Sequence, residues 1–388
     1  MLVVFFINAI QYSITIQKDR CLIFQEGQNI EHCFDDSPKE SCGVVGVYSP
    51  DFEVAQTLFY ALYALQHRGQ ESAGISTSAD GHIFSHKDTG LVSHVFQEND
   101  LDSLVGKLGI GHTRYSTTGS SNNRNSQPLH VKGANSELAL AHNGNMVNVL
   151  ELKKELELEG VEFNTTIDSE VIAHLINNYP SGEISEKVKY AMRKIKGAYS
   201  LTILYKDQIV GVRDPHGVRP LCIGKIDNSY IIASESCALD HVGAEFVREV
   251  EPGEIIVIDK TGLNSFHYDG LTVRPAPCIF EYIYFARPDS VMNGLLNYSV
   301  RRKMGIQLAK KYPVEADVVI GVPDSAIPAA IGYAFESGIE YSDGLIRNRY
   351  VGRTFIQPEQ RFRVLGASLK YNTLAEVVNN KRVVVLDD

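Results

Sequence analysis

The 388-residue sequence has no tryptophan, no block of basic residues and no CxxC pair of cysteines. Without that spacing the cysteines do not indicate zinc, and six are too few for a disulfide scaffold in a chain of this length. A net charge of −10 without a basic cluster argues against nucleic acid as a partner. The apolar start of the chain is far shorter than the ~20 residues of a membrane span, so we expect no membrane partner.

The residues that are present are typical of a folded enzyme. Hydrophobic residues make up 44% of the chain and charged residues 22%, which excludes a disordered protein. At ~150 residues per domain, the length corresponds to two to three domains. The six cysteines are unevenly spread, with three in the first 42 positions: Cys21, Cys33, Cys42, Cys222, Cys237 and Cys278.

The two ends of the chain differ in kind. Residues 1–41 lack the basic start and the small-residue cleavage site of a secretory signal. We interpret them as a leader, a linker or a mis-assigned start, and expect a cytoplasmic protein; an organellar leader stays an open alternative. Residues 381–388 are a β-branched run that ends on two aspartates, the pattern of a buried parallel strand. A domain rarely ends on a central strand, so we expect this one to be incomplete at its C-terminus.

The pattern between the ends changes once. Up to about Tyr268 the sequence predicts short strands and turns with few long helices, and after Pro277 a strand–loop–helix alternation indicates a parallel sheet. We therefore predict an antiparallel layered domain and then an α/β domain, with the boundary near 268–280. The predicted strands are 43–48, 108–112, 138–142, 198–205, 230–233, 254–258 and 317–322. The predicted helices are 52–66, 150–159, 169–177, 299–311 and 327–337.

Four polar loops follow a cysteine that stands directly before a strand. Cys42 precedes the predicted strand 43–48. The loops are Gln-His-Arg-Gly-Gln-Glu-Ser-Ala-Gly at 66–74, His-Thr-Arg-Tyr-Ser-Thr at 112–117, Ala-His-Asn-Gly-Asn at 141–145 and Thr-Thr-Ile-Asp-Ser-Glu at 165–170. Polar loops between apolar elements are where binding residues tend to lie. One such loop alone is a weak signal, but all four in order behind Cys42 are a strong one.

With these motifs, residues 41–388 resemble the amidophosphoribosyltransferase family. Its members join a class II glutamine amidotransferase of the N-terminal-nucleophile class to a type I phosphoribosyltransferase. The resemblance implies an α+β four-layer αββα glutaminase domain over 42–268. It implies an α/β parallel-sheet phosphoribosyltransferase domain over 280–388. The implied reaction is glutamine-dependent transfer of ammonia to phosphoribosyl pyrophosphate, the first committed step of de novo purine biosynthesis.

The resemblance also assigns the glutaminase residues. Cys42 becomes the nucleophile once the leader is removed, because its free α-amino group can accept the thiol proton. Asn143 and the backbone N–H of Gly144 form the oxyanion hole. Arg114 binds the α-carboxylate of glutamine, and Asp168 binds its α-ammonium group. Taken singly, ordinary interpretations also fit: a surface ion pair for Arg114, a helix N-cap for Asp168, and a hairpin turn at 143–144. His67 and Arg68 are expected to position a loop, and His112 and His142 to hydrogen-bond at strand ends.

In the second domain the resemblance points to anion and magnesium binding. Ser325 corresponds to a position linked to Mg²⁺, although a plain hydroxyl at a helix start also fits it. Arg349, Arg353 and Lys370 resemble a loop that closes over pyrophosphate, although basic loops are usually just solvated. Asp387 and Asp388 correspond to acids that hold the ribose hydroxyls and magnesium. The phosphate-binding loop that should follow is absent, so we expect this chain to be a glutaminase without sugar transfer.

Cys278 corresponds to the first of four cysteines that hold a [4Fe–4S] cluster in one branch of the family, and the other three are missing here. A buried apolar cysteine is the alternative. Glutamine and phosphoribosyl pyrophosphate are the implied substrates, purine nucleotides the implied feedback inhibitors, and a homo-oligomer the implied assembly. Two other functions stay open: a different glutaminase-fused synthase, and a non-catalytic binding or regulatory fragment.

Overall fold

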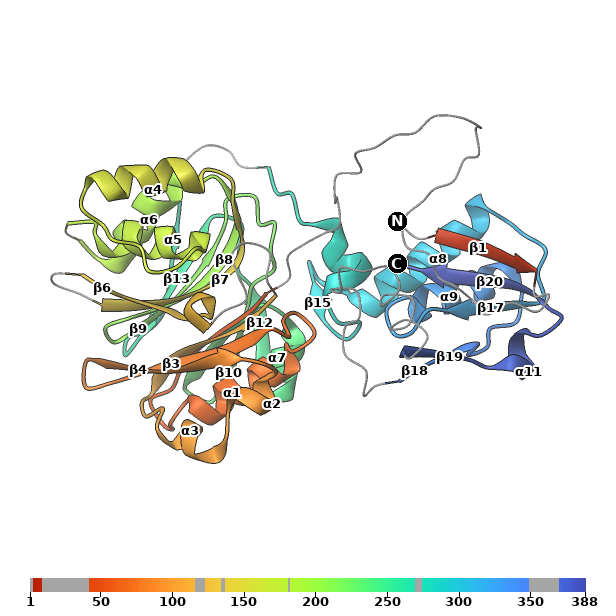
Figure 1. Ribbon diagram of the computed structural model, residues 1–388, viewed down its shortest axis with the longest axis horizontal. Helices are drawn as coiled ribbons and strands as arrows, with labels where there is room; N and C mark the ends of the chain where they lie inside the picture. The colour runs from red at the N-terminus through yellow and green to blue at the C-terminus, as the bar shows by residue number, and fades with distance from the viewer. Residues whose placement is uncertain are drawn as a thin grey trace. The chain divides into compact units, whose positions relative to one another are not determined.

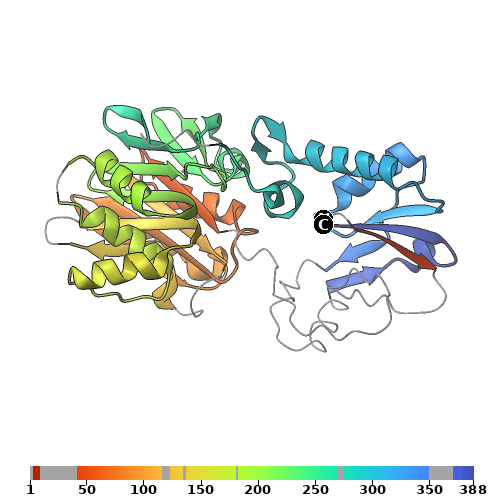
Figure 2. The same ribbon diagram turned by 90° about the horizontal axis from the view of Figure 1, so that it is seen from above.

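The computed structural model describes residues 3–8, 42–115, 123–133, 137–180, 182–268, 274–348 and 370–388. The chain divides into two compact units, which Figures 1 and 2 show in two views. The larger unit comprises Pro38–Glu281 and Phe285–Gly294, and the smaller unit comprises Met1–Ser37, Tyr282–Tyr284 and Leu295–Asp388. No helix in the part of the chain that the structure describes is long and apolar enough to cross a membrane.

The larger unit contains two antiparallel sheets. The first sheet has the order β12-β10-β11-β2-β5-β3-β4. Its strands are β2 (Gly43–Tyr48), β3 (Ser72–Ala79), β4 (His82–Thr89), β5 (Leu108–Arg114), β10 (Cys222–Ile226), β11 (Ser229–Ala233) and β12 (Glu245–Glu249). The second sheet has the order β14-β13-β9-β8-β7-β6. Its strands are β6 (Leu129–Lys132), β7 (Glu137–Met146), β8 (Gly197–Tyr205), β9 (Gln208–Arg213), β13 (Glu254–Asp259) and β14 (Gly262–His267).

Helices cover the outer face of each sheet (Figure 1). Over the first sheet lie α1 (Ala55–Ala64), α2 (Val92–Val95), α3 (Glu98–Asp102) and α7 (Ser236–His241). Over the second sheet lie α4 (Val149–Leu158), α5 (Asp168–Asn177) and α6 (Ile184–Lys194). A short 3₁₀ turn, η1 (Asn123–Asn125), precedes β6. Apolar side chains such as Val44, Ile110 and Leu204 fill the space between the sheets. This is the predicted αββα arrangement, in which each sheet buries one face against its helices and the other against its partner sheet.

The predicted elements agree with the structure, with two differences that matter for the site. The helix expected at 52–66 is α1, which is shorter at both ends. The strand expected at 138–142 is β7, which continues to Met146 because it pairs with β8 as far as Met146 opposite Gly197. Asn143 and Gly144 therefore lie inside a strand, and the hairpin-turn interpretation is wrong.

The smaller unit is built around two parallel strands. β17 (Val318–Gly321) and β20 (Arg382–Asp387) pair in parallel, as the sequence predicts. The backbone of β1 (Val3–Asn8) pairs antiparallel with the other edge of β20, a strand that the sequence did not predict. Helices α8 (Asn297–Lys311) and α9 (Ile327–Ser337) lie beside this sheet (Figure 2). Its remaining elements are β16 (Leu295–Leu296), β18 (Leu345–Arg347), β19 (Tyr371–Thr373) and α11 (Ala375–Val378). β15 (Val291–Met292) belongs to the larger unit, and η2 (Glu281–Phe285) has residues in both.

Candidate active site

Cys42 lies directly before β2 and is partly exposed. The next residue, Gly43, pairs with Thr113 of β5, so Cys42 stands beside the C-terminal end of that strand. The thiol donates a weak hydrogen bond to the carbonyl oxygen of Tyr115, with Sγ and O 3.6 Å apart. The sheet register therefore brings together the cysteine and the loop at 112–117, two motifs that are 70 residues apart in the sequence.

Arg114 is the last residue of β5, where it pairs with Ser72 of β3 and is almost completely buried. Its burial is inconsistent with the alternative of a surface ion pair. The turn at 66–69 packs directly on this strand end: a Cβ on Gly69 would lie 2.5–2.6 Å from backbone atoms of Thr113 and Arg114. Only glycine permits this approach, so the first and second polar motifs close over the same end of β5.

Asn143 and Gly144 lie near the end of β7. Asn143 is completely buried, and neither its Oδ1 nor its Nδ2 has a hydrogen-bond partner among the described residues. Leaving a buried amide unpaired costs ~1–3 kcal/mol, so such a group usually has a functional reason. Gly144 has φ +151°, and a Cβ there would lie 2.0 Å from the carbonyl oxygen of Ala198 on β8. This position therefore requires glycine.

A hydrogen bond between two histidines connects the ends of β5 and β7. Nε2 of His112 donates to the carbonyl oxygen of His142 across 3.0 Å, which confirms the expected hydrogen bonding at the strand ends. Burial, followed by the nearby positive charge of Arg114, lowers the pKa of His112 to about 3. The imidazole is therefore neutral at physiological pH, with its proton on Nε2. Because His142 precedes Asn143, this bond ties the end of β7 that carries the unpaired amide to β5, the strand that pairs with Gly43 next to Cys42.

Asp168 is the first residue of α5, so it is not the N-cap, which is Ile167. Its Oδ2 accepts a hydrogen bond from the backbone N–H of Met146 at 3.0 Å, and its Oδ1 lies 3.6 Å from Nδ1 of His142. Burial raises the pKa of this carboxyl group, but His142 and the Met146 N–H together lower it below its ordinary value. Asp168 is therefore an ionised carboxylate that is held against the end of β7.

Arg68 makes a contact with the nucleophile position that sequence reasoning missed. Its Nε donates to the carbonyl oxygen of Cys42 at 3.0 Å. The same guanidinium group is completely buried and pairs with Glu235 and Glu281. Both acids lie more than 160 positions away in the sequence, so no local motif signals them. The sequence assigned Arg68 to loop positioning, and the structure shows that it also bonds to the residue proposed as nucleophile.

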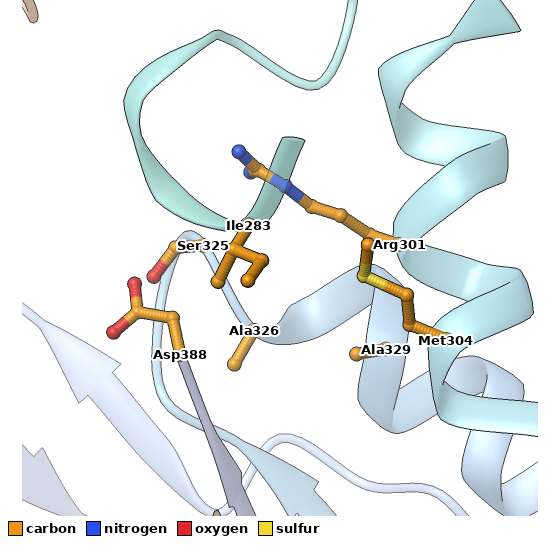
Figure 3. Close-up of a pocket in the computed structure, with 7 residues that line it drawn as sticks. All are labelled: Ile283, Arg301, Met304, Ser325, Ala326, Ala329 and Asp388. Atoms are coloured by element: carbon orange, nitrogen blue, oxygen red, sulfur yellow. The ribbon is translucent and has the colours of Figure 1, made fainter. Parts of the chain in front are cut away.

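In the smaller unit, a pocket forms where β17 and β20 end (Figure 3). The backbone N–H of Val322 bonds to the carbonyl oxygen of Leu386, which aligns the loop before α9 with the last residues of β20. The pocket is lined by Ile283, Arg301, Met304, Ser325, Ala326, Ala329 and Asp388. Figure 3 shows the hydroxyl of Ser325 and the carboxylate of Asp388 at the same side of this pocket. Oδ2 of Asp388 is buried and has no hydrogen-bond partner among the described residues.

Lys370 directly precedes β19. The backbone N–H of Asn348 bonds to the carbonyl oxygen of Lys370 at 2.7 Å, which extends the pairing of β18 with β19. Two further contacts reach the loop that follows β17: Nη1 of Arg347 lies 2.7 Å from Oδ2 of Asp324, and the hydroxyl of Tyr371 donates to the carbonyl oxygen of Pro323. Arg347, Asp324 and Tyr371 were not among the predicted site residues. Arg349 and Arg353, which were predicted, lie outside the described residues.

Comparison with known proteins gives three concordant results. Residues 112–241 match the family described as a glutamine amidotransferase domain. An amidophosphoribosyltransferase of Synechocystis sp. is 51% identical over 369 residues, which cover 94% of this chain and 74% of the relative. An amidophosphoribosyltransferase of Archaeoglobus fulgidus is 51% identical over 350 residues, which cover 89% of this chain and 76% of the relative.

The chain belongs to the amidophosphoribosyltransferase family.

Solved structures of this family agree with the fold. The glutamine phosphoribosylpyrophosphate amidotransferase of Bacillus subtilis, complexed with ADP and GMP, is 45% identical with a TM-score of 0.81, covering 88% of this chain and 74% of that one. A structure described as the allosteric regulatory enzyme of purine biosynthesis is 46% identical with a TM-score of 0.82. The match covers 88% of this chain and 73% of that one. Amidophosphoribosyltransferases are pentosyltransferases that catalyse the first committed step of purine biosynthesis, and this chain belongs to that enzyme class. The expectation that this chain acts as a glutaminase without sugar transfer stays a prediction. The other functions left open by the sequence are not supported.

The cysteines of this chain do not assemble a metal centre in the part that the structure describes. No group of three or more histidine, cysteine or acidic side chains there is arranged so that it could hold a metal ion. Cys222 of β10 and Cys237 of α7 are buried in the core that includes α1, and Cys42 stands directly before β2. A [4Fe–4S] cluster needs about four thiolates. The described residues around Cys278 therefore do not fit a cluster.

Proposed function

We propose that Cys42 is the nucleophile that releases ammonia from glutamine. The thiol proton passes to the α-amino group of Cys42, which is free once residues 1–41 are removed, and the thiolate attacks the side-chain amide carbon. The C–N bond then breaks, the proton moves to the leaving nitrogen, and ammonia departs from a thioester. Water hydrolyses the thioester to glutamate and restores the thiol.

The buried, unpaired amide of Asn143 is the observation that carries this proposal. A tetrahedral intermediate places negative charge on the former carbonyl oxygen, and a preorganised donor stabilises that charge. Nδ2 of Asn143 and the backbone N–H of Gly144 would be these donors. In the described residues the amide bonds to nothing else, so it needs no rearrangement to meet the oxyanion. This is the property expected of an oxyanion hole.

Arg114 and Asp168 would recognise the two ends of the glutamine backbone. A guanidinium fork suits a carboxylate, and a carboxylate suits an ammonium group. Both side chains are buried. Arg114 is the last residue of β5, the strand that pairs with Gly43 next to Cys42. Asp168 is the first residue of α5 and is hydrogen-bonded to the end of β7 that carries Asn143. One positive and one negative side chain at this place would favour glutamine over amides that lack an α-carboxylate and an α-ammonium group.

The test is mass spectrometry combined with glutamate release. We expect a species that begins at Cys42, alkylation of Cys42 by iodoacetamide, and no glutamate release by Cys42→Ala. Cys278→Ser is the matched control, because Cys278 is also partly exposed, and it should keep the activity. Undiminished glutamate release by Cys42→Ala would refute the proposal.

We also propose that Ser325, Asp387 and Asp388 hold Mg²⁺ and the ribose of phosphoribosyl pyrophosphate. Carboxylate oxygens suit this hard cation, and the unpaired Oδ2 of Asp388 in the pocket fits such a ligand. When bound, magnesium would neutralise charge on the departing pyrophosphate. Lys370, together with Arg349 and Arg353, would bind the pyrophosphate. No cluster is proposed, since the described residues contain no group of three or more ligating side chains that could hold a metal ion.

Regulation, assembly and compartment are further proposals. The relative from B. subtilis was solved with ADP and GMP, which supports purine nucleotides as feedback inhibitors of this chain. Inhibition assays with these two nucleotides test that role, and light scattering tests the expected homo-oligomer. The proposed compartment is the cytoplasm, and fractionation of cells that express the chain tests it.

A further inference from the structure

Arg68 carries a completely buried positive charge in the larger unit. A buried charge is tolerated only when partners compensate for it. Here two carboxylates do so: Oε1 of Glu235 lies 2.5 Å from Nη1, and both oxygens of Glu281 lie within 3.0 Å of Nη1 and Nη2. Together they keep Arg68 charged and raise its pKa above the ordinary value, although burial acts in the opposite direction.

The two acids contribute differently to the geometry. Glu281 binds both terminal nitrogens of Arg68 in a fork, which fixes the plane of the guanidinium group. That plane determines where Nε–H points, and it points at the carbonyl oxygen of Cys42, 3.0 Å away. Glu281 is itself held by Nη1 of Arg219 at 3.3 Å. Glu235 instead shares its oxygens among Arg68, His67 and the hydroxyl of Ser290.

We propose that Glu281 is a positioning residue for the glutaminase reaction, acting through Arg68 to fix the main chain of Cys42. The proposal rests on the proposed role of Cys42 as the nucleophile. Glu281 lies beyond the 42–268 range predicted for the glutaminase domain and beyond the matched range 112–241. A residue from the connecting segment therefore completes the glutaminase.

The experiment compares two glutamate-to-glutamine variants of the full chain. Glu281→Gln keeps the size of the side chain and removes its charge, while Glu235 still neutralises Arg68, so the fold should survive. The matched control is Glu254→Gln, because Glu254 is equally buried and makes the same forked pair with Arg248, which has no hydrogen bond to Cys42 among the described residues. The measurements are kcat and KM for glutamine hydrolysis, the rate of Cys42 alkylation by iodoacetamide, and Tm.

We expect Glu281→Gln to lower kcat by ~10–100-fold with KM changed less than about twofold, because misplacing a reacting group by ~1 Å costs about that much. The alkylation rate of Cys42 should change as well. Glu254→Gln should lower Tm and leave kcat within about twofold. If Glu281→Gln does not fold, Glu281→Asp, which keeps the charge but not the reach, is expected to show the same loss of kcat.

Wild-type kcat in Glu281→Gln, or an equal loss of kcat in Glu254→Gln, would overturn the positioning role. So would a rise in KM alone, since that is the effect of a disturbed glutamine site. Cys42→Ala separates this failure from failure of the proposed function. If Cys42→Ala is inactive and Glu281→Gln is normal, only the positioning role is wrong; if Cys42→Ala is active, the nucleophile itself is wrong.

Discussion

Oδ2 of Asp168 accepts a hydrogen bond from the backbone N–H of Met146 at 3.0 Å, which ties the first residue of α5 to the last residue of β7. Asn143 and Gly144 lie two to three residues before that bond. This carboxylate therefore fixes the strand end that carries the proposed oxyanion hole, and in its proposed role it would also bind the glutamine ammonium group.

Asp168→Asn should mainly weaken glutamine binding. A hydrogen bond to a charged group is worth ~1.5–3 kcal/mol, so we expect KM for glutamine to rise by ~10–100-fold. The alkylation rate of Cys42 should stay near wild type, because Asp168 is not bonded to Cys42. Steady-state kinetics of glutamate release measure this, with exposed Asp102→Asn as the control. An unchanged KM would remove Asp168 from the binding site.

Asn143→Ala should lower the rate without lowering stability. Loss of one oxyanion donor costs ~3 kcal/mol, which corresponds to a ~10²–10³-fold fall in kcat. The amide has no partner among the described residues, so its removal should leave the free energy of unfolding nearly unchanged.

Asn148→Ala is the converse control for Asn143. Asn148 donates to the carbonyl oxygen of Lys194 and accepts from the N–H of Lys196, both across 2.9 Å. Its loss should lower stability by ~1–2 kcal/mol and leave kcat unchanged. If Asn143→Ala destabilises the protein as Asn148→Ala does and keeps its kcat, the amide is structural.

Glu170→Gln should lose stability in a pH-dependent way. Glu170 accepts hydrogen bonds from the backbone N–H groups of Asn164 and Thr165 and from the Thr165 hydroxyl. Burial raises the pKa of this carboxyl group, but these bonds and His174 outweigh it and lower the pKa from 4.5 to about 2. The carboxylate therefore stabilises the fold fully above about pH 4.5, and this contribution is lost as the pH falls towards 2.

Urea unfolding at pH 7 and pH 3 measures this effect. We expect Glu170→Gln to be less stable by ~2–3 kcal/mol at pH 7, with the difference from wild type shrinking at pH 3. Glu98→Gln is the control, since Glu98 also lies in the first turn of a helix but is exposed. A difference that stays constant between the two pH values would contradict the lowered pKa.

Asp388→Asn should weaken stabilisation by the sugar substrate. A ligand present at 100 times its Kd stabilises the folded state by ~2.7 kcal/mol, so phosphoribosyl pyrophosphate with Mg²⁺ should raise Tm. We expect Asp388→Asn to lose most of this shift. Asp317→Asn is the control, because Asp317 pairs with Arg382 at the opposite end of β20. Equal shifts in both variants would exclude Asp388 as a ligand.

Part of the secondary structure could be predicted from the sequence, because burial leaves a periodic trace, but strands such as β3 and β4 and the helix α6 were not predicted. The strands at 43–48 and 254–258 are continuous apolar runs, and α9 begins with a proline in its first turn. The extent of β7 could not be predicted, because Asn143-Gly144 also fits a turn and only the pairing with β8 excludes one. The edge strand Val3–Asn8 could not be predicted either, because its partner β20 lies at the other end of the chain.

The sequence by itself determined the family, the four polar motifs and the residue types that glutamine chemistry needs, because these are local patterns. Only the tertiary structure decided that Arg68 bonds to Cys42 and that Glu235 and Glu281 hold Arg68. It also decided that the amide of Asn143 is buried and, within the described residues, unpaired. The physical reason is that a buried charge can take its partners from any strand end that the fold brings near, whatever their distance along the chain.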